Sequence, residues 1–131
     1  MRLSVYCVCM LLCATAPAAP GETMRIVTYN IHHDEGDDGE VDVDRVADVL
    51  RDTGADVICL QEVDRGLSRT GRLDLPALFR EKLGMQAVYG PNLYFDDGAY
   101  GNLTLTRYAV LGERNLTLPG PEGAEPRRAR F

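Results

Sequence analysis

"ADVICLQEVDR", residues 55–65, places the apolar residues of a predicted strand directly before Gln61 and Glu62. A strand with near-continuous apolar residues is usually covered on both faces, as it is inside an α/β layer. A carboxylate at its end is then partly desolvated, which is unfavourable unless a cation or hydrogen bonds compensate. Either the strand simply reaches solvent at Gln61, or Glu62 has a partner that the rest of the chain provides.

The segments before this stretch predict a strand–helix–strand unit. "RIVTYN", residues 25–30, alternates and is typical of a strand ending at Asn30. A helix is predicted over residues 43–53, because apolar residues recur there at helical spacing. Asp42 or Asp44 can cap its start and Gly54 can end it.

A unit of this kind makes its two strands parallel, so that their carboxyl ends lie at one edge of the sheet. Asn30 and Glu62 are each predicted at such an end, at the edge where α/β layers bind ligands. Amide and carboxylate oxygens are hard donors that suit Mg²⁺ or Mn²⁺. A divalent cation would therefore explain a carboxylate in this position.

The rest of the chain predicts one more helix and several strands. The helix covers residues 75–84, and a short strand follows at residues 86–90. Residues 91–98 are expected to form a loop, and residues 100–107 and 108–118 a strand pair. "RRARF", residues 127–131, is expected to open a further strand. The order of elements predicts an α/β sandwich-type layer.

Composition fits a folded domain but not an unaided nucleic-acid binder. The chain has 131 residues, of which 45% are hydrophobic and 26% charged, and its formal net charge is −6. No Lys/Arg-rich run occurs, whereas nonspecific duplex binding requires a basic footprint. The sequence also lacks a GxGxxG and a GxxxxGK[ST] motif, which argues against dinucleotide and P-loop nucleotide binding.

Residues 1–23 are interpreted as a signal peptide, with residues 24–131 forming the domain. Arg2 precedes an apolar stretch that is too short for a transmembrane span, and "ATAPAAP" has the small residues of a cleavage site. This predicts a secreted or periplasmic protein. The alternative is that translation starts at Met24, which would make the protein cytoplasmic.

Three motifs together strongly resemble the endonuclease/exonuclease/phosphatase superfamily of metal-dependent phosphoesterases. They are "MRIVTYNIHH", "GADVICLQEVDR" and "YGNLTLTRY", in that order along the chain. The resemblance implies a four-layer α/β sandwich, of which this chain supplies roughly the first half, one sheet plus two helices. It also implies Mg²⁺ or Mn²⁺ as cofactor and a phosphate ester as substrate: a phospholipid, an inositol phosphate or a nucleic acid.

The same resemblance assigns roles to individual residues. Asn30 and Glu62 would be catalytic and metal-site residues, with Glu62 the direct ligand and Asn30 orienting it or the substrate. Tyr100 and Asn102 would lie near the phosphate pocket. Thr106 stands where the family more often has serine.

Basic residues after Glu62 add candidates for substrate binding. Arg65 and Arg69 are predicted in the loop that follows the strand and are placed to meet phosphate, although surface arginines are common. Arg65 is the one assigned to substrate binding. His32 and His33 follow the first strand and are expected to be loop residues at the rim.

The later motifs of the family are absent from this sequence. It contains no "GDFN" and no Ser-Asp-His near its end. We therefore expect an N-terminal part of the domain, truncated before the missing C-terminal half and inactive at this length. The alternatives are a non-catalytic remnant that retains the half-fold and weak metal binding, and an unrelated α/β binding module.

Overall fold

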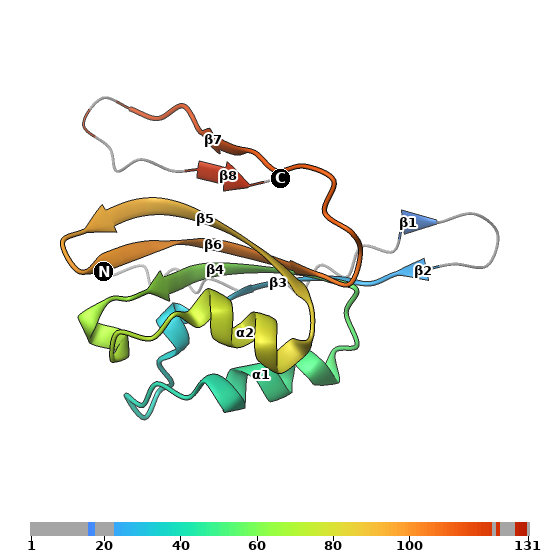
Figure 1. Ribbon diagram of the computed structural model, residues 1–131, viewed down its shortest axis with the longest axis horizontal. Helices are drawn as coiled ribbons and strands as arrows, with labels where there is room; N and C mark the ends of the chain where they lie inside the picture. Colours follow the sequence, from blue (N-terminus) through green and yellow to red (C-terminus); the bar gives the residue numbers. More distant parts are fainter. Residues whose placement is uncertain (1–15, 18–22, 122, 124–127, 131) are drawn as a thin grey trace, which may run out of the picture.

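The computed structural model describes residues 16–17, 23–121, 123 and 128–130. Its main body is a single four-stranded sheet with two helices on one face (Figure 1). The elements, in chain order, are β1 (Ala16–Pro17), β2 (Thr23–Met24), β3 (Ile26–Asn30), η1 (His32–Asp34), α1 (Val43–Asp52), β4 (Val57–Arg65), η2 (Ser68–Thr70), α2 (Leu75–Leu83), β5 (Gln86–Phe95), β6 (Gly98–Thr106), β7 (Asn115–Thr117) and β8 (Arg128–Arg130).

The predicted strand–helix–strand unit is confirmed. β3 pairs with β4 in parallel, and the register runs from Ile26 opposite Val57 to Asn30 opposite Gln61. Asp42 caps α1 by accepting a hydrogen bond from the backbone N–H of Arg45 at 3.0 Å. Gly54 has a φ of +61°, which ends the helical path at little steric cost. Local signals therefore placed this unit correctly.

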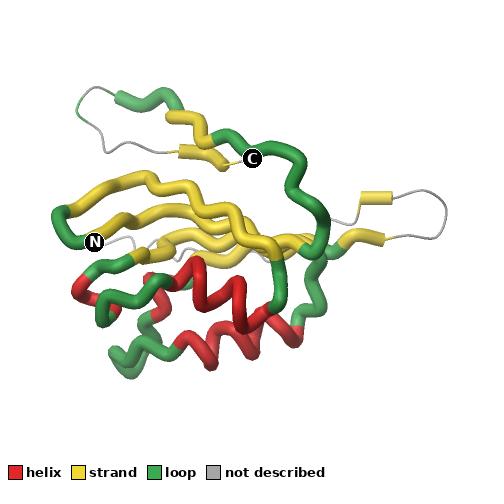
Figure 2. The backbone as a smooth tube through the Cα atoms, in the orientation of Figure 1, coloured by secondary structure: helices red, strands yellow, loops and turns green. Residues whose placement is uncertain are grey.

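The helices and the sheet share one apolar core. α1 and α2 lie side by side on the same face of the sheet, as the red segments of Figure 2 show. Side chains from both layers are fully buried between them, and removing each from water contributes about 1.5–3 kcal/mol. They include Ala47, Leu50, Ile58, Leu60, Leu75, Phe79, Leu103 and Leu105.

The second half of the sheet differs from prediction. Its strand order is β3-β4-β6-β5, and β6 pairs antiparallel with both β4 and β5. Residues 91–95, expected to be a loop, continue β5, and only Asp96 and Asp97 form the turn into β6. The expected pairing of residues 100–107 with 108–118 is wrong, because both edges of β6 are already occupied.

On the opposite face of the sheet, the middle of β3 and β4 carries polar and small side chains. Thr28, Cys59 and Gln61 lie there, and the Gln61 side chain donates a hydrogen bond to Thr28 Oγ1 at 3.1 Å. The β7–β8 hairpin lies against this face over β5 and β6 (Figure 1). Asn102 Nδ2 donates to the backbone oxygen of Arg128 at 3.1 Å, which ties the hairpin to β6.

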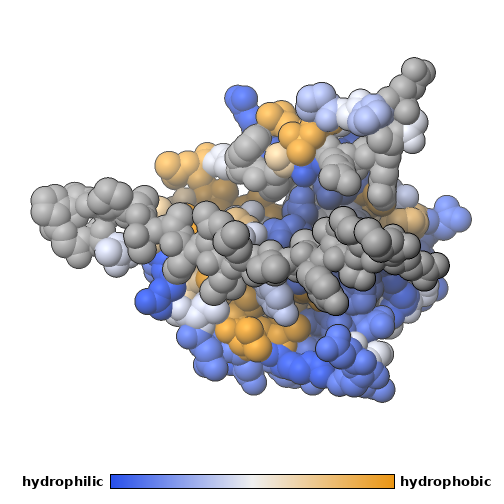
Figure 3. Space-filling view, turned by 180° about the vertical axis from the view of Figure 1, so that it is seen from behind, coloured by the Kyte–Doolittle hydropathy of each residue, from blue (hydrophilic) through white to orange (hydrophobic). Residues whose placement is uncertain are grey.

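Large hydrophobic side chains are exposed at several places along the described part of the chain. Figure 3 shows hydrophobic side chains in separate areas among hydrophilic ones. The large hydrophobic residues that are exposed are Val49, Tyr94, Phe95, Tyr108, Val110, Leu111, Leu116 and Leu118. Most of them belong to the end of β5 and to the segment after β6.

Most of the predicted signal peptide, residues 1–23, lies outside the described residues. Its described residues are Ala16, Pro17 and Thr23, and Ala16–Pro17 pairs with Thr23–Met24 in a short antiparallel ribbon apart from the main sheet. Within the described part of the chain, no helix has the length and apolar character needed to cross a membrane.

Candidate active site

Glu62 lies at a β-bulge inside β4. The expected end of the strand at Leu60 is wrong, because β4 continues to Arg65. Leu60 is opposite Leu103 and Val63 is opposite Gly101, so that two β4 residues, Gln61 and Glu62, share one place in the ladder. Glu62 has a φ of +60°, a left-handed conformation that non-glycine residues seldom adopt. Bulges of this kind re-aim side chains and are common beside active sites.

Asn30 holds the Glu62 carboxylate. Asn30 Nδ2 donates a hydrogen bond to Glu62 Oε1 at 2.8 Å. The backbone N–H of His32 donates to Asn30 Oδ1 at 3.0 Å, and this fixes which side of the amide faces Glu62. The structure thus brings together the two residues that the sequence placed at one sheet edge. Because the Asn30 oxygen already accepts a hydrogen bond, the geometry favours a positioning role for Asn30.

A left-handed turn follows β3 and brings His33 to the same place. His32, His33 and Asp34 have φ values of 49°, 45° and 71°. His33 Nδ1 lies 3.8 Å from Glu62 Oε2. Burial and the nearby Arg69 cation lower the pKa of His33 and outweigh the opposite effects of Asp64 and Glu62. The contact with Glu62 is an ion pair only when the imidazole is protonated, which the lowered pKa disfavours.

Asp64 and Arg69 form the strongest ion pair near the site. Asp64 is fully buried, and Arg69 Nε and Nη2 each donate to one of its oxygens at 2.7 Å. This pairing raises the pKa of Arg69, which remains a permanent cation. The guanidinium also lies 5.4 Å from the centre of the Tyr100 ring, where a cation–π contact adds to the orientation.

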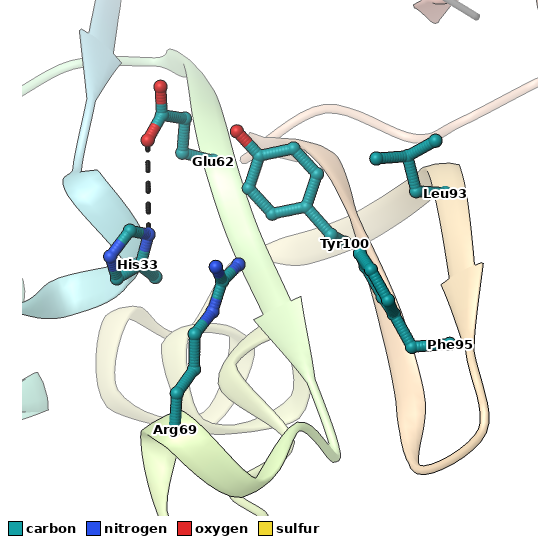
Figure 4. Close-up of a pocket in the computed structure, with 6 residues that line it drawn as sticks. All are labelled: His33, Glu62, Arg69, Leu93, Phe95 and Tyr100. Carbon is teal, nitrogen blue, oxygen red and sulfur yellow. Dashed lines mark ion pairs between the residues drawn. The ribbon is translucent and has the colours of Figure 1, made fainter. Parts of the chain in front are cut away.

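These side chains surround one open pocket of about 320 Å³. Figure 4 shows the residues that line it and how they face one another: His33, Glu62, Arg69, Leu93, Phe95 and Tyr100. Glu62 and Tyr100 were expected in such a site. Arg69 was one of two arginines considered. Leu93 and Phe95 were missed, because β5 was expected to end before them.

Two of the expected substrate-binding residues lie elsewhere. Arg65 is at the end of β4 and its guanidinium lies 4.9 Å from the centre of the Tyr89 ring, outside the pocket lining. Asn102 is opposite the bulge, but its amide is hydrogen-bonded to Arg128. Of the two candidate arginines, Arg69 is the one that the structure brings to Glu62, because the η2 turn folds it back over the sheet.

The residues that could hold a metal ion are few. Among the residues described, no group of three or more His, Cys, Asp or Glu side chains is arranged to hold one. Glu62 has one oxygen fixed by Asn30 and a side chain that is 31% exposed, so it could serve as a single carboxylate ligand. Mg²⁺ commonly binds through one or two carboxylates and keeps several waters, so this partial ligand set fits a weakly held hard ion.

Asp34 is a second buried carboxylate, on the far side of the left-handed turn. It is 1% exposed, and neither of its oxygens has a hydrogen-bond partner among the described residues. Burial, together with the neighbouring Asp42, raises the pKa of Asp34 to about 6, although Arg45 acts in the opposite direction. Asp34 is absent from the lining of the Glu62 pocket.

Comparisons with known proteins agree with the motifs. Residues 27–131 match the model of the Endonuclease/Exonuclease/phosphatase family. The chain is similar to the endonuclease/exonuclease/phosphatase from Beutenbergia cavernae DSM 12333, with a TM-score of 0.59 and 29% identity over 73% of this chain and 29% of that chain. A family protein from Leptotrichia buccalis C-1013-b has the same fold, with a TM-score of 0.55 and 18% identity over 72% of this chain and 42% of that chain. This chain therefore spans less than half the length of either protein.

Proposed function

Because the chain belongs to the endonuclease/exonuclease/phosphatase family, we propose that the Glu62 pocket is the metal and phosphate end of a divalent-metal-dependent phosphoesterase site. The observation that carries this proposal is Glu62 itself, held in a left-handed bulge with its carboxylate oriented by Asn30 at 2.8 Å. Strained backbone persists where the surrounding structure over-determines it, and such positions cluster at functional sites.

Each residue of the pocket has a distinct role in this proposal. Glu62 binds Mg²⁺ or Mn²⁺ through the oxygen that Asn30 leaves accessible. A bound divalent ion would neutralise negative charge on the phosphoryl group and polarise it. Arg69 binds a phosphate oxygen, and Asp64 and Tyr100 hold its guanidinium in place. The substrate is a phosphate ester.

We further propose that the chain alone binds the ion weakly and does not turn over substrate. Among the described residues that line the pocket, Glu62 is the one carboxylate that could bind an ion. The same observation favours a second candidate function, a non-catalytic domain piece that retains weak metal binding. The two candidates differ in whether groups from outside this chain can complete the site.

Mn²⁺ titration of the full chain tests the metal proposal. We expect the parent chain to bind Mn²⁺ weakly, as monitored by electron paramagnetic resonance. Glu62→Gln should abolish this binding and Asn30→Ala should reduce it. Glu81→Gln, on the exposed surface of α2, is the matched control and should bind as the parent does. Equal Mn²⁺ binding by Glu62→Gln and the parent would refute the proposed ligand.

A hydrolysis assay separates the two candidate functions. The full chain, with Mn²⁺ and a nitrophenyl phosphodiester, should show no turnover. Turnover that Glu62→Gln abolishes would show that this length is active and would exclude the non-catalytic alternative.

We also propose that the chain is exported when translation starts at Met1. Arg2, the apolar stretch and the small residues before Thr23 support this. Sequencing the amino terminus of the expressed protein tests it, since an intact terminus on a cell-associated protein would contradict export.

A further inference from the structure

The pocket has two chemically different halves, one on each side of Tyr100. Figure 4 shows Glu62, His33 and Arg69 on one side of its ring and Leu93 and Phe95 on the other. The first half has a carboxylate, an imidazole and a guanidinium. The second half has only aliphatic and aromatic surface. A ligand that fills the whole pocket must therefore be polar at one end and apolar at the other.

A second β-bulge gives the pocket its apolar half. On β5, Pro91 is opposite Gly101 but Leu93 is opposite Tyr100, so Asn92 is an extra residue in the ladder. If Asn92 were paired with Tyr100 in a regular ladder, Leu93 would be opposite Ala99, whose side chain is buried. The bulge moves Leu93, and with it Phe95, onto the face that carries Tyr100. One bulge thus aims Glu62 into the pocket, and the other aims the apolar wall into the same space.

The apolar wall is accessible to a ligand. Phe95 is 51% exposed, which leaves much of its ring in contact with water. The turn that follows it is anchored, because the backbone N–H of Ser68 donates a hydrogen bond to Asp97 Oδ2 at 2.8 Å. This contact joins the β5–β6 turn to the segment that bears Arg69. The wall and the guanidinium are therefore held at a set separation before any ligand binds.

The charge of the pocket limits how many phosphates it can take. Among its described lining residues, Arg69 is the one permanent cation, and two of its donors already serve Asp64. Glu62 adds a negative charge, and the formal net charge of the whole chain is −6. Only one phosphate of a ligand can therefore pair directly with a guanidinium in this lining. A ligand with one phosphate can use the remaining Arg69 donors.

We propose that the site takes a phosphate ester with a single phosphate and an apolar substituent. The phosphate lies against Arg69, beside the Glu62 carboxylate that would hold a divalent ion, and the apolar group lies against Leu93 and Phe95. This inference rests on the proposed function and adds the substrate class. The site should therefore bind a simple amphiphilic phosphate ester in preference to hydroxyl-rich and polyphosphorylated esters.

Two probes with the same ring test this preference. Cyclohexyl phosphate and inositol monophosphate differ in the hydroxyl groups of the ring, and inorganic phosphate supplies the reference without a ring. Titrated calorimetrically into the full chain with Mg²⁺, cyclohexyl phosphate should bind about tenfold more tightly than inositol monophosphate, since it buries apolar surface on the wall. Inositol monophosphate should bind no better than inorganic phosphate.

Variants test whether the preference for cyclohexyl phosphate depends on Leu93 and Phe95. Leu93→Ala and Phe95→Ala should each reduce the cyclohexyl advantage to about threefold or less and leave inorganic phosphate binding unchanged. Leu111→Ala is the matched control for Leu93→Ala, because Leu111 is 98% exposed and outside the pocket. Arg69→Gln should weaken all three probes by a similar factor. Phe95→Ala keeps the test valid if Leu93→Ala fails to fold, because Phe95 is half exposed.

The outcomes distinguish this inference from the proposed function. Equal affinities for cyclohexyl phosphate and inositol monophosphate would overturn the inference alone, and so would an equal loss in Leu111→Ala. Binding of none of the phosphate probes would overturn the phosphate assignment together with it. Mn²⁺ binding that does not depend on Glu62 would contradict the proposed function whatever the probes show.

Discussion

Asp64 and Asp34 are both buried carboxylates, yet their surroundings are opposite. Asp64 is fully buried and receives two hydrogen bonds from Arg69 at 2.7 Å, with Thr70 Oγ1 a third donor at 3.4 Å. Asp34 is 1% exposed, and neither oxygen of its carboxylate has a hydrogen-bond partner among the described residues. Burial of a charge is tolerated where it is paired, and otherwise the group tends to become neutral.

The Asp64 carboxylate organises a site, whereas the Asp34 carboxylate destabilises the fold. Asp64 keeps Arg69 facing Glu62 and Tyr100, so its burial serves the pocket. Asp34 follows two other left-handed residues in a turn and has a pKa raised to about 6. Removing the partner of Asp64 should therefore lower the free energy of unfolding, whereas removing the charge of Asp34 should raise it.

Removal of Arg69 should have the largest effect on stability. Arg69→Met leaves Asp64 buried without its cation. We expect the free energy of unfolding to fall by about 3 kcal/mol. This value is at the low end for buried pairs because Arg69 is partly exposed. Urea denaturation measures it. Arg51→Met is the control, since Arg51 pairs with Asp48 on the exposed surface and should lose less than about 1 kcal/mol. Equal losses in the two variants would show that Asp64 does not need its partner.

Asp34→Asn should stabilise the protein, by an amount that depends on pH. The pKa of Asp34 is raised in the folded state from 3.8 to about 6. Protonated Asp34 therefore favours the fold, an effect fully present below about pH 4 and lost as pH rises through about 6. Above that range the variant should be more stable than the parent by up to about 3 kcal/mol, and below about pH 4 the difference should vanish.

Thermal unfolding followed across this pH range measures the effect. Asp37→Asn, an exposed residue of the same loop, is the control and should show no such dependence on pH. A stabilisation that is constant at all pH values would mean that ionisation of Asp34 is not its cause.

The Glu62 carboxylate has fewer hydrogen bonds than that of Asp64 and more than that of Asp34. Its strain is in the backbone. Because its φ is +60°, Glu62→Gly should be more stable than Glu62→Ala by about 1 kcal/mol. Gln61 is the matched control, since it has no positive φ in the same strand. There the order should reverse, with Gln61→Ala more stable than Gln61→Gly. Chemical denaturation of the four variants measures their stabilities. The same order of Gly and Ala variants at both positions would argue against the bulge.

The elements that were predicted correctly have local signals. Asp42 and Gly54 mark the ends of α1, and the apolar residues between them face one way. The extent of β4 and β5 was underestimated because a bulge interrupts the alternation in each, at Glu62 and at Asn92. The segment 108–118 has strand-like composition, but its expected partner β6 is paired on both sides, which the sequence does not reveal.

The candidate site was predictable where it depends on topology. Asn30 and Glu62 meet because parallel neighbouring strands bring them to one edge, and this follows from the order of elements. The choice of Arg69 over Arg65 depends on the η2 turn and on pairing with Asp64, which no pattern in the sequence indicates. Leu93 and Phe95 depend on the second bulge and were missed for the same reason.

The bulge in β4 also means that the sheet is complete without Glu62. Leu60 and Val63 both belong to the helix-side core, with Gln61 on the other face. Deleting Glu62 would join Gln61 to Val63 and leave an uninterrupted alternation of inward and outward side chains. Such a deletion should preserve the melting temperature while removing Mn²⁺ binding. Loss of a single codon would then remove the proposed metal ligand and leave the scaffold intact.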